Sequence, residues 1–255
     1  MPLLADILPA TVFTFLVIFA RVGAMLMAMP GFGETFVSQR IRLVMALAIA
    51  AVIMPVVGAG VPDMPAQPVQ LLPLIAGETL IGIFIGGLLR LLVTALHVAG
   101  VVISFQSSLG FAQFFDPAQG TQGALVGSFL TIMGLTLIFV TDLHHVLLRA
   151  VVDSYTLFPI ARLPAAADFA RTATEWVGAS FLIGTQISAP FIAYALVLYI
   201  GMGLVNRLMP QMQVFFIVMP LQILLALVFL TVTLGALAVW FLDHFEERAA
   251  MFLVG

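Results

Sequence analysis

Six long apolar runs, separated by short polar or proline-rich stretches, dominate the pattern of hydrophobic and polar positions along the 255 residues. Their approximate ranges are 7–29, 41–57, 73–103, 124–141, 174–204 and 214–242. A helix needs about 20 apolar residues to cross a membrane, so each run is a candidate span. The pattern therefore predicts an all-α membrane protein with about six apolar helices in hairpins.

Composition supports this class, because 63% of the residues are hydrophobic and only 8% are charged, against roughly 25% charged in soluble domains. We expect a single integral-membrane domain over 1–255, with helices 1–4 in 1–150 and a C-terminal helical hairpin in 174–242. The start lacks a basic region typical of a signal peptide, so the first run should remain in the chain. The third and fifth runs are longer than one span requires, so we expect some helices to face protein rather than lipid.

A loop with unusual composition interrupts the apolar pattern at 104–123, SFQSSLGFAQFFDPAQGTQG. Gly110 and Gly120 permit backbone conformations that other residues avoid, and Pro117 disfavours helix at the residue before it. Three phenylalanines nevertheless occupy the middle of the loop, at Phe111, Phe114 and Phe115. Such a loop suits a re-entrant plug across a pore, and the alternative is an exposed connection whose phenylalanines dip into the membrane interface.

Small and polar residues recur every three or four positions along the third run, which places them on one half of a helix. They are Glu78, Gly82, Gly86, Arg90, Thr94, His97, Gly100 and Ser104. The fifth run repeats the small-residue spacing with Ser180, Gly184 and Ser188. Small residues at this spacing allow helices to approach closely, so these faces either contact neighbouring subunits or line a wet conduit.

Few residues suggest chemistry. Arg21 lies inside the first run, where a charge needs a partner; Glu34, an acid of another subunit, or the membrane interface are the candidates. His144 and His145 follow Asp142, but adjacent histidines diverge on a helix, so we expect no metal site. The chain has no cysteine, and its charge of −3 comes with nine scattered arginines, which argues against nucleic-acid binding. We expect no cofactor and no enzymatic activity.

Prolines and polar residues mark the last two runs. Pro190 should kink the fifth run, and Pro220 lies early in the sixth. Between the runs stands NRLMPQMQVFFIVMPLQI at 206–223, where an amide, an arginine, a proline and a glutamine gather. An ordinary turn does not require all four.

That stretch resembles the R-subunit family of the flagellar type III export gate, with Pro-Gln after an arginine and a proline five residues beyond Phe215. Val218 departs from the glycine usual in this motif, and the chain has no lysine. Further matches cover essentially the whole chain: Arg21 with Gly23 and Pro30, Arg40 and Arg42, Glu78 with Gly82, the loop from Gly110 to Asp116, His144 with His145, and Ala189 with Pro190. The T subunit of the injectisome is the close relative and stays open as an alternative.

The resemblance implies a structural and gating subunit of a protein-export channel in the bacterial inner membrane, within the flagellar basal body. It implies P and Q subunits as partners, contacts with the B and A subunits (FlhB and FlhA), and passage of unfolded flagellar proteins. The implied plug or gate residues are Gly110, Phe111, Phe114, Phe115, Asp116, Pro117 and Gly120. The candidate subunit-interface residues are Glu78, Gly82, Gly86, Arg90, Ser180, Gly184, Ser188, Asn206, Arg207, Pro210, Gln211 and Phe215.

Two other functions compete with this one. A secondary transporter could use the broken helices at Pro190 and Pro220 and a midplane site at Glu78, Arg90 and His97, but the sequence shows no inverted repeat. An intramembrane enzyme would need a convergent set of catalytic groups, whereas the ionisable residues here are scattered.

Overall fold

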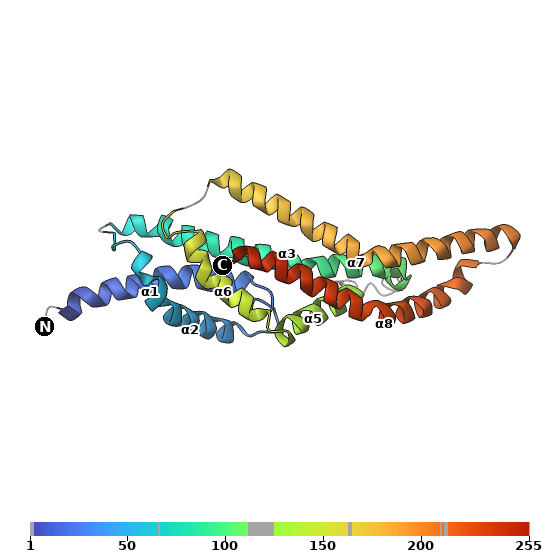
Figure 1. Ribbon diagram of the computed structural model, residues 1–255, viewed down its shortest axis with the longest axis horizontal. Helices are drawn as coiled ribbons and strands as arrows, with labels where there is room; N and C mark the ends of the chain where they lie inside the picture. The colour runs from blue at the N-terminus through green and yellow to red at the C-terminus, as the bar shows by residue number, and fades with distance from the viewer. Residues whose placement is uncertain are drawn as a thin grey trace. The chain divides into compact units, whose positions relative to one another are not determined.

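The computed structural model describes residues 3–65, 67–111, 125–162, 165–209, 211 and 214–254. Within this part of the chain every long element is a helix and no strand occurs, which confirms the all-α prediction (Figure 1). The helices are α1 (Leu3–Ala28), α2 (Gln39–Val57), α3 (Leu71–Gln106), α5 (Leu125–Val140), α6 (His144–Leu157), α7 (Ala166–Leu208) and α8 (Val214–Ala249). Short 3₁₀ turns lie at Gly58–Gly60, Pro68–Gln70, Leu109–Phe111 and Ala250–Phe252.

Among the described residues, five helices are long and apolar enough to cross a membrane, with spans of Pro9–Ala28, Gln39–Gly60, Leu71–Gln106, Ala166–Leu208 and Val218–Phe252. The pair formed by α5 and α6 makes a sixth if it counts as one broken span, since the two helices meet at 77°. Asp142 lies at this bend with a φ of 61°, a conformation that a regular helix cannot contain. The prediction of about six apolar helices is therefore confirmed.

Local sequence explains how α1 connects to α2. Gly31 has a φ of 82° in the turn that follows α1, a backbone conformation that other residues rarely adopt. Ser38 then caps α2, because its side-chain oxygen accepts a hydrogen bond from the backbone N–H of Ile41. This tight connection lets α1 and α2 pack against each other (Figure 1).

One connection differs from its prediction. The prolines between Pro55 and Pro73 predict an extended loop, but α2 continues to Val57 and two 3₁₀ turns follow. The sequence before the fifth run contains α6, a separate helix that the apolar pattern did not reveal. Pro190 and Pro220 lie inside α7 and α8, and α7 changes direction near its middle in Figure 1.

The contacts divide the chain into two compact units that do not follow the division into 1–150 and 174–242. Unit 1 comprises the described residues of Met1–Leu91, Phe139–Trp176 and Glu246–Gly255, and unit 2 those of Leu92–Ile138 and Val177–Phe245. Buried apolar side chains of α1, α3 and α6 form the core of unit 1, among them Ile18, Met25, Ile85 and Leu147. In unit 2 the core includes Leu96, Leu130, Phe191 and Phe241. The single integral-membrane domain remains a prediction.

Candidate functional site

A buried ion pair lies at the centre of unit 1. Arg21 on α1 and Glu78 on α3 are 0% and 1% exposed, and both Nε and Nη2 of Arg21 lie 2.6 Å from Oε2 of Glu78. A charge in an apolar interior is tolerated when it is paired and hydrogen-bonded. The prediction that Arg21 needs a partner is thus confirmed, but the proposed partner Glu34 is wrong.

The same guanidinium also binds the end of α6. Nη1 of Arg21 donates hydrogen bonds to the backbone oxygens of Ser154, at 3.0 Å, and Phe158, at 2.8 Å. The last carbonyls of a helix lack partners within the helix and carry a partial negative charge, so a cation there is favourable. The Arg21 guanidinium carbon also lies 4.3 Å from the centre of the Tyr155 ring. One side chain thereby connects α1, α3 and α6.

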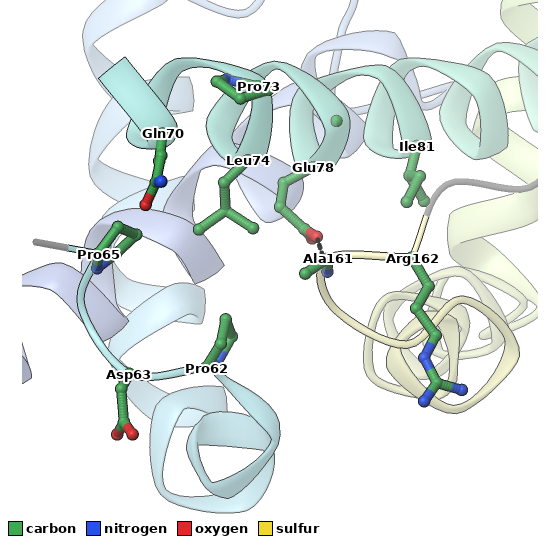
Figure 2. Close-up of a pocket in the computed structure, with 11 residues that line it drawn as sticks. Pro62, Asp63, Pro65, Gln70, Pro73, Leu74, Glu78, Ile81, Ala161 and Arg162 are labelled. Atoms are coloured by element: carbon green, nitrogen blue, oxygen red, sulfur yellow. Dashed lines mark hydrogen bonds between the residues drawn. The ribbon is translucent and has the colours of Figure 1, made fainter. Parts of the chain in front are cut away.

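Glu78 holds the connection that follows α6. Its Oε1 accepts a hydrogen bond of 3.3 Å from the backbone N–H of Ala161, a residue with a φ of 65° (Figure 2). A pocket of about 380 Å³ opens beside this contact. The charged ends of Asp63 and Arg162, which also line the pocket, point away from Glu78 in Figure 2. Both carboxylate oxygens of Glu78 already accept hydrogen bonds, one from Arg21 and one from Ala161. The Glu78 carboxylate beside the pocket is therefore not free to act as a base.

Glu34 forms a second ion pair in unit 1, with a different arginine. Nη2 of Arg90 lies 3.3 Å from Oε2 of Glu34, and the two side chains are 42% and 16% exposed. Arg90 and Glu78 were predicted on one polar face of α3, and in the described structure each binds an oppositely charged residue within the chain. Their role between subunits remains a prediction.

The small residues of the third run let α1 approach α3. A Cβ atom built on Gly86 would lie 2.6 Å from the main-chain oxygen of Met25 and 2.8 Å from the Cβ of Ala28. A Cβ on Gly82 would clash with the main-chain oxygen of Arg21. The close helix contact that the spacing predicts is therefore present within this chain. Whether the same face also contacts other subunits is a prediction.

We expect Gly86→Leu to prevent accumulation of the folded chain and of any complex that contains it. Three added carbons beyond Cβ cannot fit where Cβ already overlaps the α1 backbone. The amount of tagged chain in membranes, and of partners that co-purify with it, would measure the effect. Gly87→Leu is the matched control, because a Cβ on Gly87 meets no heavy atom within 4 Å. Equal yields of the two variants would contradict the prediction.

The other predicted interface residues fall into two groups. Gly184 approaches α3, since a Cβ there would lie 2.9 Å from the oxygen of Ala95, and Ser180 and Ser188 are buried beside it on α7. Asn206, Arg207 and Gln211 are exposed near the end of α7. Pro210 and the side chain of Phe215 lie outside the described residues.

Most of the predicted plug also lies outside the described residues. Gly110 and Phe111 belong to the 3₁₀ turn Leu109–Phe111, which follows the end of α3. A Cβ on Gly110 would lie 3.2 Å from the Phe105 ring, so the turn is already closely packed. Phe114, Phe115, Asp116, Pro117 and Gly120 are not described. That no described helix runs on through 104–123 is confirmed, because α3 ends at Gln106.

The structure places Asp142, His144 and His145 closer together than the helical argument implied. His144 and His145 start α6 and Asp142 lies in the turn before it, and the two imidazole centres are 4.1 Å apart. One potential ligand atom from each residue lies within 4.8 Å of the others, whereas two ligands of one zinc ion are about 3.4 Å apart. His144 instead stacks on Phe139, and His145 lies near Asp142. We infer no metal site from this arrangement.

Sequence reasoning missed Ser154, Tyr155 and Phe158, which complete the ion-pair site. Two of them act through backbone oxygens, which no residue type reveals. Tyr155 carried a usable signal, because it is a polar aromatic residue in a chain with only three tyrosines. Its hydroxyl donates to the backbone oxygen of Ile18 at 3.2 Å.

Comparison with known proteins assigns the chain to a family. The family model "Bacterial export proteins, family 1" matches residues 12–248. A flagellar biosynthetic protein FliR from Caulobacter vibrioides is 41% identical over 241 residues, which cover 94% of this chain and 96% of the relative. Proteins of the same name from Aquifex aeolicus and Bacillus subtilis are 30% and 29% identical, and the alignments cover 94% and 92% of this chain and 92% and 89% of those relatives. The chain therefore belongs to family 1 of the bacterial export proteins and, within it, to the FliR family.

Proposed function

We propose that this protein is a structural and gating subunit of the flagellar type III protein-export channel, in the bacterial inner membrane. The match to the export family over residues 12–248 carries the proposal. The protein joins P and Q subunits, contacts the B and A subunits, and carries out no chemistry of its own. Unfolded flagellar proteins pass through the assembled channel.

The exposed apolar surface of α7 and α8 supports a role in which other subunits pack against this chain. More than half of the most apolar stretch of α3 is buried within the chain (56%), against 22% for α7 and only 6% for α8. Large apolar side chains such as Val197 on α7 and Val232 on α8 are exposed. Apolar surface of this extent requires lipid or other protein. P- and Q-like subunits are the protein partners that we propose for it.

Co-purification tests the assembly. The tagged chain, extracted in mild detergent from its native host, should bring down P- and Q-like subunits in fixed ratio. Recovery of the chain alone, in full yield and stably folded, would contradict the proposal and favour a protein that works by itself.

The loop at 104–123 is the proposed plug. Support comes from its three phenylalanines, its glycines, and the end of α3 at Gln106, after which the chain leaves the helix. A ring of apolar side chains can close a channel by excluding water. The loop therefore seals the pore while no protein is being exported.

The transporter alternative receives little support from the described residues. Glu78 and Arg90, two of its three midplane candidates, are engaged in ion pairs within unit 1. The third, His97, lies in unit 2, where its Nδ1 is 3.0 Å from the position of a Cβ on Gly127. A residue in tight contact with a helix backbone has little room for a substrate.

Arg207→Ala and Gln211→Ala should each lower the amount of assembled complex. Both residues are exposed in this chain, and we propose that a partner subunit supplies the groups that they bind. Loss of one member of a buried, charge-assisted pair costs on the order of 3 kcal/mol. Native gels of extracted membranes, with swarming motility alongside, measure the effect. If both variants assemble and swim normally, the 206–211 turn is an exposed connection.

A further inference from the structure

The end of α3 is anchored by a glutamine from a distant helix. Gln222 lies on α8 and is 2% exposed, and its Nε2 donates a hydrogen bond of 2.7 Å to the backbone oxygen of Gln106, the last residue of α3. The two residues are 116 positions apart in the sequence. The contact lies within unit 2 and joins α8 to the point where the chain leaves α3 for the loop.

This bond matters because the last carbonyls of a helix have no partners within the helix. Near the end of α3, the oxygen of Ile103 accepts from the N–H of Ser107 at 2.9 Å, and that of Phe105 accepts from the N–H of Ser108 at 3.4 Å. The hydroxyl of Ser107 donates to the oxygen of Ser104 at 3.1 Å. The last four carbonyls of α3 belong to residues 103–106. Turn residues next to the helix thus supply the hydrogen-bond donors for the first three of them.

The fourth carbonyl, that of Gln106, receives its hydrogen bond from Gln222. Gln106 itself is half-buried, but Ser104, Ser107 and Ser108 around it are each at most 2% exposed, so the hydrogen bond is partly shielded from water. An unpaired buried carbonyl costs more than an exposed one. Among the described residues, Gln222 is therefore the side chain from another element that completes the set.

A tyrosine on α7 holds the anchoring residue in turn. The Tyr194 hydroxyl donates to the backbone oxygen of Gln222 at 3.0 Å, and its ring stacks on Phe229 of α8. Ser108, two residues after the anchored Gln106, has a φ of 60°, which turns the chain sharply. The direction in which the loop departs thus depends on an anchor supplied by the C-terminal hairpin.

We propose that Gln222 is a positioning residue for the gate: it fixes the end of α3 from the C-terminal hairpin and so sets where the loop at 104–123 begins. The anchor rests on the described contacts, and its consequence for gating rests on the proposed function. Loss of Gln222 loosens the turn at Ser107 and Ser108 and lets the closed pore leak, while the helices remain assembled.

Cysteine labelling tests the anchor without reference to gating. The chain has no native cysteine, so Ser108→Cys introduces a single thiol at a buried position. In the assembled complex, Gln222→Met should raise the maleimide labelling rate of this thiol by about tenfold, the factor that corresponds to loss of one buried hydrogen bond. Gln186→Met, at an exposed glutamine of α7, is the matched control and should leave the rate unchanged. An unchanged rate in Gln222→Met would overturn the proposal.

Tyr194→Phe keeps the test available if Gln222→Met does not assemble. It leaves the side chain of Gln222 intact and removes only the hydroxyl that supports it, so labelling should rise by a smaller factor. No rise in Tyr194→Phe would then count against the anchor.

Ion leakage, measured at equal amounts of complex, separates this proposal from the proposed function. Faster labelling together with leakage supports both. Faster labelling without leakage supports the anchor at the end of α3 and contradicts its consequence for gating, and the plug itself is then tested by the phenylalanine variant. Leakage without faster labelling overturns the anchor and leaves the plug in place.

Discussion

Replacing Glu78 by alanine should almost abolish accumulation of the folded protein. Arg21, which is fully buried, would keep its charge and lose the carboxylate that binds two of its nitrogens. Removing one member of a buried ion pair costs about 3–5 kcal/mol, which is a large part of the stability of a typical domain. Resistance of the membrane-inserted chain to added protease, followed against denaturant or temperature, measures the loss.

The pair between Glu34 and Arg90 provides a matched control. It is also a carboxylate–guanidinium contact within unit 1, but its side chains are partly exposed. Exposed pairs contribute at most about 1 kcal/mol, so Glu34→Ala should leave most of the protein folded. If Glu78→Ala proved as stable as Glu34→Ala, the buried pair would have no special importance for the fold.

Combining Glu78→Ala with Arg21→Met should restore part of the loss. The double variant contains no unpaired charge in the core, and apolar replacements of buried pairs are often neutral. Recovery should be incomplete, because the carbonyls of Ser154 and Phe158 would lose the hydrogen bonds that Arg21 donates. Full recovery would show that these two bonds contribute nothing measurable.

Truncating Phe111, Phe114 and Phe115 together to alanine should make the assembled complex conduct ions while no protein is being exported. The change removes the apolar obstruction that we propose and leaves the scaffold helices unaltered. Membrane conductance, or growth under sodium or proton stress, measures the leak beside the amount of assembled complex. Phe36→Ala is the control, since Phe36 is an exposed phenylalanine outside the loop. If the triple variant assembles and conducts no more ions than the parent, another subunit must close the pore.

Gly110→Asp, in contrast to the phenylalanine truncations, should restrict the movement of the loop. Gly110→Asp adds a charge and places atoms against the Phe105 ring, where even a Cβ would come within 3.2 Å. We therefore expect export of flagellar proteins to fall while assembly persists. Secretion into the medium, compared at equal amounts of complex, measures this effect.

Apolar patterning predicted where the long helices lie, because burial and lipid both select for apolar residues. All six runs became helices, and Asp168 lies in the first turn of α7, as expected of an acid near a helix start. The pattern missed α6 because that helix carries charged and polar residues, such as Arg149 and Asp153, along with its apolar ones. Helices of this kind leave no long apolar run.

The sequence alone could not predict which residues of distant segments would form contacts. Glu34 is thirteen positions from Arg21 and was a natural candidate, yet Glu78, at a separation of 57, forms the pair. The sequence marked both residues as charges that need partners and did not indicate which would meet. Gln222 was visible only as a polar residue in a motif, because its partner is a backbone oxygen.

The network around Arg21 also constrains how the protein is made. Ribosomes add about 5–20 residues per second, so Glu78 emerges roughly 3–11 s after Arg21, and Ser154, at a separation of 133, roughly 7–27 s after it. During that interval α1 carries a charge whose partners have not yet been synthesised. The first helix therefore cannot reach its final environment in the order of synthesis, and its insertion must stay reversible, or be assisted, until the middle of the chain arrives.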